Sequence, residues 1–118
     1  MENIKNETLE EVLYERIEFL QKKVFGQTWP TRNIDFSIQE YCKLLGVEVK
    51  ELLQETNYRA HKQLHSLDIP AIRQEIADIY IFTMAVSMTV FDDYHDLINE
   101  VDKKTQKNEV RDDWIINQ

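Results

Sequence analysis

Apolar residues recur at helical spacing through most of this chain. The first such segment covers about residues 8–25, and its hydrophobic positions lie three or four residues apart: Leu9, Val12, Leu13, Ile17, Leu20 and Val24. Thr8 and Glu11 form a capping-box pattern at its start, and Gly26 ends the pattern. We therefore predict a first helix over about 8–25.

A second capping-box pattern, Ser37 with Glu40, opens a longer periodic segment. Its apolar positions continue until a polar stretch begins near Tyr58, and they are Ile38, Tyr41, Cys42, Leu45, Val49, Leu52 and Leu53. The connection 26–36 mixes turn formers with Trp, Arg and Asn, which makes it a candidate ligand loop. We predict that the second helix starts at Ser37.

Two further helices follow in the second half of the chain. Asp68 can cap a third helix, and Pro70 fits its first turn, where a missing N–H costs nothing. We expect this helix to run to about Phe91, and its last thirteen positions carry no charge. Asp93 then favours a fourth helix that extends to about Arg111.

Composition supports an all-α fold in a single domain. The 118 residues include two Gly and two Pro, which is too few for the turns of a multi-stranded sheet. A chain of this length forms one domain, and a second subunit often completes its core. We therefore predict that residues 1–118 form one domain, a four-helix antiparallel bundle completed by oligomerisation.

Charge and cysteine content narrow the class of partner. The formal net charge of −8 argues against a nucleic-acid partner, which would need clustered Lys and Arg, and it favours the binding of cations. Cys42 is the only cysteine, so a reduced, cytoplasmic setting is the simplest interpretation. No uncharged run reaches the roughly 18 residues of a membrane span. We expect no membrane partner.

Two acids, Glu75 and Asp78, stand at the head of the most apolar helix. Asp78 has Ile81 and Ala85 on its own face, so we expect both carboxylates to enter the interior. An unpaired buried carboxylate is costly, and neither Lys nor Arg occurs in the thirteen positions that follow. A metal ion is therefore the partner we predict for this pair.

The preceding helix carries a second line of acids. Glu48, Glu51 and Glu55 occur at i, i+3 and i+7 and lie beside the core stripe. If the two helices pack as antiparallel neighbours, Glu48 and Glu51 face the acids of the third helix. Four carboxylates could then hold a hard cation such as Mg²⁺ or Mn²⁺. For Glu48 and Glu51 taken alone, a solvated helix face is the simpler interpretation.

Other metal centres fit the sequence less well. A di-iron bundle needs Glu-x-x-His on two helices, and the nearest match here, Asp92 with His95, falls at a turn. His61 and His65 are four residues apart and could bind Zn²⁺, but no third ligand is evident. Surface histidines are the simpler interpretation.

The acids follow a pattern that resembles a known family. Residues 45–53 (LGVEVKELL), followed by 75–78 (EIAD) and an apolar helix, resemble the MazG-like branch of the all-α nucleoside triphosphate pyrophosphohydrolases. The family pattern is E-E-x-x-E, a variable gap and then E-x-x-D, and Val47 replaces its first Glu. The resemblance covers about residues 37–111.

The resemblance implies a fold of the all-α NTP pyrophosphatase type and an activity. The expected reaction cleaves a (d)NTP between its α and β phosphates and gives the (d)NMP and pyrophosphate. The resemblance assigns four acids to catalysis and to the binding of Mg²⁺, or of Mn²⁺ in its place: Glu48, Glu51, Glu75 and Asp78. The sequence leaves open which Glu activates water and whether one or two ions bind.

A run on the fourth helix also resembles the family. Lys104, Asn108 and Arg111 look like its K-x-x-x-N-x-x-R run, and they lie at i, i+4 and i+7. One helix face could thus present two cations and an amide to the phosphates of the substrate. A solvated, dipole-matched helix C-terminus would explain the same residues equally well.

The base of the nucleotide would need a separate site. Trp29, with Arg32 and Asn33, offers stacking and hydrogen-bonding groups, and Tyr58 is another candidate. A core or subunit contact is the simpler interpretation of Trp29. Nothing in the sequence fixes the preferred base, the preferred sugar or the physiological role.

Two alternatives stay open. The first is a sibling activity, a dimeric dUTPase or dCTPase type that uses the same acids with a narrower base pocket. The second is a non-catalytic helical interaction or regulatory module, whose acids are solvated and whose apolar helix is an oligomer seam. Family members of this size usually form dimers or tetramers, so the resemblance implies a homodimer or homotetramer.

Overall fold

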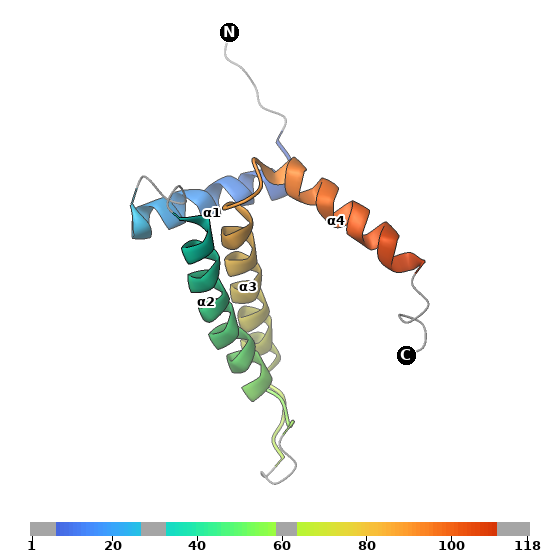
Figure 1. Cartoon of the computed structure of the whole chain (residues 1–118). Coiled ribbons are helices and arrows are strands. Elements are labelled where there is room, and N and C mark those ends of the chain that lie inside the picture. The colour runs from blue at the N-terminus through green and yellow to red at the C-terminus, as the bar shows by residue number, and fades with distance from the viewer. Residues whose placement is uncertain (1–6, 27–32, 59–63, 111–118) are drawn as a thin grey trace.

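The computed structural model describes residues 7–26, 33–58 and 64–110. Within these residues the chain has four helices and no strands: α1 (Leu9–Phe25), α2 (Ile34–Gln54), α3 (Ile69–Ser87) and α4 (Tyr94–Glu109) (Figure 1). The predicted all-α class is confirmed. None of the helices in these ranges is both long and apolar enough to cross a membrane.

The four helices do not close into one bundle. Helices α2 and α3 lie side by side and run in opposite directions, and α1 crosses one end of this pair (Figure 1). Helix α4 starts beside α1 and then leads away from α2 and α3 (Figure 1). The predicted antiparallel packing therefore holds for the second and third helices, but the predicted four-helix bundle is not closed within one chain.

Three of the four helix starts follow the predicted caps. Thr8 and Glu11 form the capping box of α1, in which the Thr8 N–H donates to Glu11 Oε1 over 3.0 Å. Asp68 and Asp93 cap α3 and α4, and each side chain accepts a backbone N–H three residues on, over 3.1 and 2.9 Å. Pro70 lies in the first turn of α3, as predicted.

The start of α2 differs from the prediction. Asn33 is the cap, because its Oδ1 accepts the N–H of Phe36 over 3.1 Å. Ser37 is already helical, since its N–H donates to the carbonyl of Asn33 over 3.0 Å. Glu40 pairs with Lys43 over 3.2 Å instead of reaching back to Ser37. Asn caps as well as Ser does, so the earlier start adds a helical turn at no loss.

Helix α3 also ends earlier than predicted. It stops at Ser87 and a turn follows, whereas the apolar pattern continues to Phe91. The hydroxyl of Ser87 donates to the carbonyl of Met84 over 2.6 Å, and the hydroxyl of Thr89 donates to that of Val86 over 2.7 Å. The carbonyl of Val86 also accepts the N–H of Thr89 over 3.1 Å, so the carbonyls at this helix end have donors without a further helical turn.

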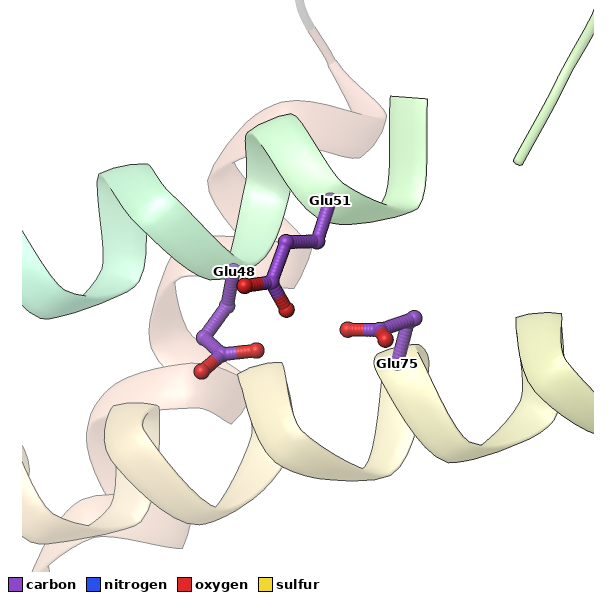
Figure 2. A group of neighbouring side chains, drawn as sticks. All are labelled: Glu48, Glu51 and Glu75. Carbon is purple, nitrogen blue, oxygen red and sulfur yellow. The ribbon is translucent and has the colours of Figure 1, made fainter. Parts of the chain in front are cut away.

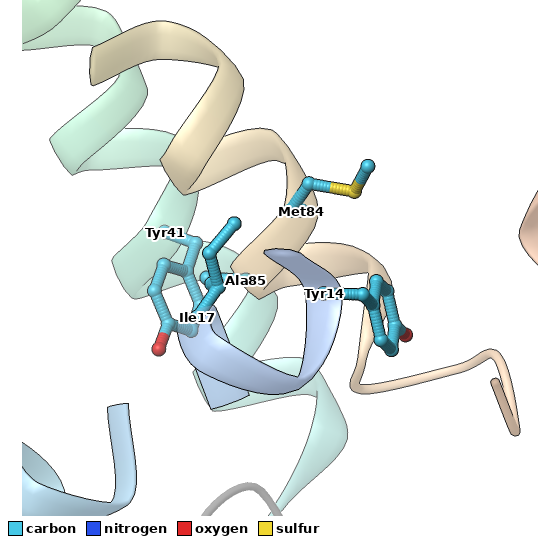
Figure 3. Packing of buried hydrophobic residues seen from close by; sticks show 5 residues of the cluster. All are labelled: Tyr14, Ile17, Tyr41, Met84 and Ala85. Atoms are coloured by element: carbon cyan, nitrogen blue, oxygen red, sulfur yellow. The ribbon is translucent and has the colours of Figure 1, made fainter. Parts of the chain in front are cut away.

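The hydrophobic core lies where α1 crosses the α2–α3 pair (Figure 3). Tyr41 anchors it from α2, and its hydroxyl donates to the buried Oε1 of Gln21 on α1 over 2.8 Å. The buried apolar residues come from α1, α2 and α3, and they are Tyr14, Ile17, Tyr41, Met84 and Ala85. The core thus fixes one end of the α2–α3 pair.

Much apolar surface stays exposed in a single chain. On α3, the side chains of Ile76 and Tyr80 are 52% and 43% exposed, and on α1 that of Phe19 is 71% exposed. Only three residues of α3 are buried: Met84, Ala85 and Ser87. Much of the apolar surface of α3 therefore stays exposed within one chain.

Candidate metal centre

Three of the predicted acids meet between α2 and α3. Glu48 and Glu51 project from α2 and Glu75 from α3, and Figure 2 shows their carboxylates pointing toward one another. Each residue offers one oxygen, and these three oxygens all lie within 4.8 Å of one another. The i, i+3 spacing on α2 and the antiparallel packing on α3 produce this group, which we call the acidic cluster.

Asp78 lies at the margin of the acidic cluster and not within it. Its side chain is exposed, so the expectation that both acids of α3 enter the interior holds only for Glu75, which is partly buried. A step of three residues turns Asp78 by about 60° around the helix axis, and its side chain is one methylene shorter. Asp78 is nevertheless close enough for its charge to raise the pKa of Glu48 and of Glu75.

The acidic cluster opposes ionisation of its own members. Burial raises the pKa of Glu48 above its ordinary value of 4.5, and the negative charge of Glu51 raises it further. The pKa of Glu75 is raised by the same two causes in the same order. Loss of water and like-charge repulsion both disfavour the ionised carboxylates.

Two oxygens of the acidic cluster have no partner. Oε2 of Glu48 and Oε2 of Glu75 are shielded from solvent and make no hydrogen bond. Among the described residues, no Lys, Arg or His forms an ion pair with any of the three acids. Shielded carboxylate oxygens without a cation or donor are costly, and a positive ion would relieve that cost.

The donor set fits a hard divalent cation. The three ligands are carboxylate oxygens, which Mg²⁺ and Mn²⁺ prefer. In an octahedral Mg²⁺ site with metal–oxygen distances of about 2.1 Å, neighbouring oxygens lie about 3.0 Å apart and opposite oxygens about 4.2 Å apart. The three oxygens of the acidic cluster lie within 4.8 Å of one another, so the side chains would draw closer around an ion and leave its other positions to water or substrate. Glu48, Glu51 and Glu75 could therefore hold one ion.

Of the predicted substrate-binding residues, the two that the structure describes do not lie at the acidic cluster of the same chain. Lys104 and Asn108 lie on α4, which leads away from α2 and α3 (Figure 1). Arg111, Trp29 and Arg32 lie outside the described residues. Asn33, which was considered for the base, uses its side-chain oxygen to cap α2, and Tyr58 is exposed.

The histidines show one contact that sequence reasoning missed. His95 Nε2 lies 2.8 Å from Oε2 of Glu11, across 84 positions of sequence. The sequence offered one indication of this contact. The capping box uses one carboxylate oxygen of Glu11 and leaves the other oxygen available to a second partner. His65 instead contacts the carbonyl of Ser66 over 2.8 Å, while His61, its proposed zinc partner, lies outside the described residues.

Comparison with known proteins adds no relative. No protein-family model matches the chain, and neither a curated protein sequence nor a solved structure matches it. The resemblance to the MazG-like family therefore rests on the short sequence motifs alone.

Proposed function

We propose that the chain is a Mg²⁺-dependent nucleoside triphosphate pyrophosphohydrolase that cleaves a (d)NTP between its α and β phosphates. The observation that supports this proposal is the acidic cluster of Glu48, Glu51 and Glu75, with two shielded oxygens that have no partner. These acids also occur in the order and spacing that resemble the family. A triphosphate would be repelled by bare carboxylates, so a cation must lie between them.

The positions of the acidic residues suggest what each could do in the reaction. A bound Mg²⁺ would neutralise the acids, polarise the phosphoryl group and lower the pKa of a bound water. The packing of α2 against α3 fixes the positions of Glu48 and Glu75, and one glutamate of the acidic cluster orients or deprotonates the attacking water. The water oxygen joins the α-phosphorus, and the bond to the bridging oxygen breaks. The products are the monophosphate and pyrophosphate.

We also propose that the protein acts as a homodimer or homotetramer. One chain leaves large apolar side chains exposed on α1 and α3, such as Phe19 and Ile76. Helix α4 carries Lys104 and Asn108 away from the acids of its own chain, so in an oligomer these residues can serve the acids of a neighbouring subunit. Self-association would therefore both cover the apolar faces and complete the substrate site.

The exposed apolar faces also support a second candidate. A non-catalytic helical module would use the same surface on α1 and α3 to bind a protein partner. The acidic cluster would then bind no metal, and its removal would not affect any activity. A dUTPase- or dCTPase-type sibling would keep the acids and their metal but restrict the base.

The proposal is tested by measuring pyrophosphate release from a panel of standard and modified NTPs and dNTPs, with and without Mg²⁺ or Mn²⁺. We expect metal-dependent release by the wild-type protein. Glu75→Gln should reduce the rate by more than the roughly 10- to 100-fold that loss of an outer-shell partner costs at metal sites. Glu100→Gln, an exposed position on α4, removes the same charge elsewhere and should leave the rate unchanged.

The outcomes separate the candidates. Release from dUTP or dCTP alone would favour the sibling activity. Release that Glu75→Gln leaves intact would remove the acidic cluster from the reaction. No release from any nucleotide, together with a melting temperature that does not respond to either metal, would leave the helical interaction module.

A further inference from the structure

Among the described residues, the contacts of helix α4 with the hydrophobic core lie near its beginning. The ring of Tyr94 lies 5.9 Å from that of Tyr14 on α1, and Tyr94 and Leu97 pack against the core. Every residue from Ile98 to Lys107 is exposed. The direction of this helix is therefore set within its first turn.

A polar contact lies beside the aromatic one. Oε2 of Glu11 lies 2.8 Å from Nε2 of His95. The other oxygen of this carboxylate accepts the N–H of Thr8 over 3.0 Å and its hydroxyl over 3.1 Å. The backbone N–H of Thr8, and then His95, hold the pKa of Glu11 below its ordinary value. The capping box thus holds Glu11 in place, and one of its oxygens is presented to α4.

We propose that Glu11 and His95 are positioning residues that fix the direction of α4, and with it the place at which Lys104 and Asn108 are presented. The effect on substrate rests on the proposed function, whereas the effect on geometry does not. Lys104 lies about 15 Å along the helix from Tyr94, at 1.5 Å per residue. A rotation of about 20° at the first turn would therefore move it by about 5 Å, enough to lose a phosphate contact.

The geometry can be measured directly, because the chain offers a natural label site. Cys42 is the only cysteine and is exposed on α2, and Lys103→Cys adds a second site on the exposed part of α4. Spin labels at positions 42 and 103 give a distance distribution by pulsed electron resonance. Dilution with unlabelled protein removes distances between chains.

The variants are chosen to isolate the contact. His95→Ala removes it without touching the cap of α1, which Glu11→Gln would weaken. His95→Gln keeps an N–H donor at similar reach. Asn99→Ala, an exposed position one turn further along α4, is the matched control. All three variants leave the residues of the acidic cluster unchanged.

We expect one narrow distance peak in the otherwise wild-type labelled protein. In His95→Ala the population outside this peak should rise about two- to fivefold, the range expected from the loss of one exposed polar contact to a carboxylate. His95→Gln should restore the peak, and Asn99→Ala should not change it. A broad distribution without substitution, or a His95→Ala distribution equal to that of Asn99→Ala, would overturn the proposal.

Kinetics then test the consequence for substrate. If the wild type hydrolyses nucleotides, His95→Ala should raise KM severalfold with kcat nearly unchanged, and His95→Gln should restore KM. A lower kcat at unchanged KM would contradict the positioning role. If the wild type hydrolyses no nucleotide, the proposed function fails, and the distance measurement alone decides whether Glu11 and His95 direct α4.

Discussion

At the scale of single residues, the acidic cluster places negative charge where it is least favourable. Glu48 and Glu75 each have an oxygen that is shielded from water and has no partner, and both face Glu51. Their raised pKa values mean that the folded protein binds protons on them more tightly than the unfolded chain does. Metal-free folding is thus disfavoured by their ionisation.

This arrangement makes a prediction for stability and pH. The contribution of Glu48 and Glu75 to the free energy of unfolding is most favourable below their ordinary pKa of 4.5. This contribution is lost as pH rises through their raised pKa values. We therefore expect Glu75→Gln to raise the melting temperature of the metal-free protein at pH 7 and to have less effect at pH 4. Mg²⁺ or Mn²⁺ should stabilise the wild type at pH 7 and have less effect on the variant. Thermal unfolding with and without chelator measures both effects.

A control variant distinguishes repulsion within the acidic cluster from the effect of the net charge of the protein. Glu100→Gln changes the net charge of −8 by the same unit at an exposed position. If Glu100→Gln raised the melting temperature as much as Glu75→Gln does, the effect would be general repulsion. The contribution of Glu11 to stability depends on pH in the opposite way. Its pKa is lowered in the folded protein, so the stability it contributes is lost as pH falls. Glu11 therefore cannot produce the loss of stability that we expect above pH 4.5.

The sequence predicted the acidic cluster because helix geometry is local. An i, i+3 pair lies on one face of a helix wherever that helix packs, so Glu48 and Glu51 had to project together. The exposure of Asp78 was not predictable in this way, because it depends on how α3 is rotated against α2. The Glu11–His95 contact joins residues 84 positions apart, and no local rule indicates it.

At the scale of elements, side-chain caps determine where the helices begin. The caps at Thr8, Asp68 and Asp93 agree with the prediction, because each is a strong capping residue directly before the first residue of its helix. For α2 two capping residues compete, Asn33 and Ser37. The earlier one prevails, because a helix that starts there gains a further turn of backbone hydrogen bonds.

The choice between Asn33 and Ser37 as the cap of α2 can be tested by replacing each of them with alanine. Asn33→Ala removes the bond from the N–H of Phe36 and should reduce the free energy of unfolding by about 1 kcal/mol. Ser37→Ala should have little effect, because the N–H of Ser37 already bonds to the carbonyl of Asn33. Urea unfolding of the two variants measures the difference. The reverse order of effects would place the start of α2 at Ser37 after all.

At the scale of the whole molecule, one chain is more open than its length requires. The radius of gyration is 18.0 Å, whereas a compact chain of 118 residues has one of about 13.5 Å. The turn between α3 and α4 is short, so the sequence predicted that α4 would fold back along the pair. Whether it does so depends on long-range packing, and the apolar positions of α4, such as Ile98 and Val101, do not specify what covers them.

The open shape leads us to expect that stability depends on protein concentration. If a second copy covers Ile76 and its neighbours, only the assembled form gains their burial, so each tenfold rise in concentration should stabilise a dimer by about 1.4 kcal/mol. Unfolding monitored over a hundredfold concentration range, with light scattering for mass, measures this dependence.

Ile76→Lys should weaken the dependence of stability on concentration. The side chain of Ile76 is 52% exposed in one chain, so the single chain tolerates the change. Asn99→Lys adds the same cation at an exposed polar site on α4 and should not weaken it. A monomeric mass with a concentration-independent melting temperature would show instead that the open chain is the complete molecule.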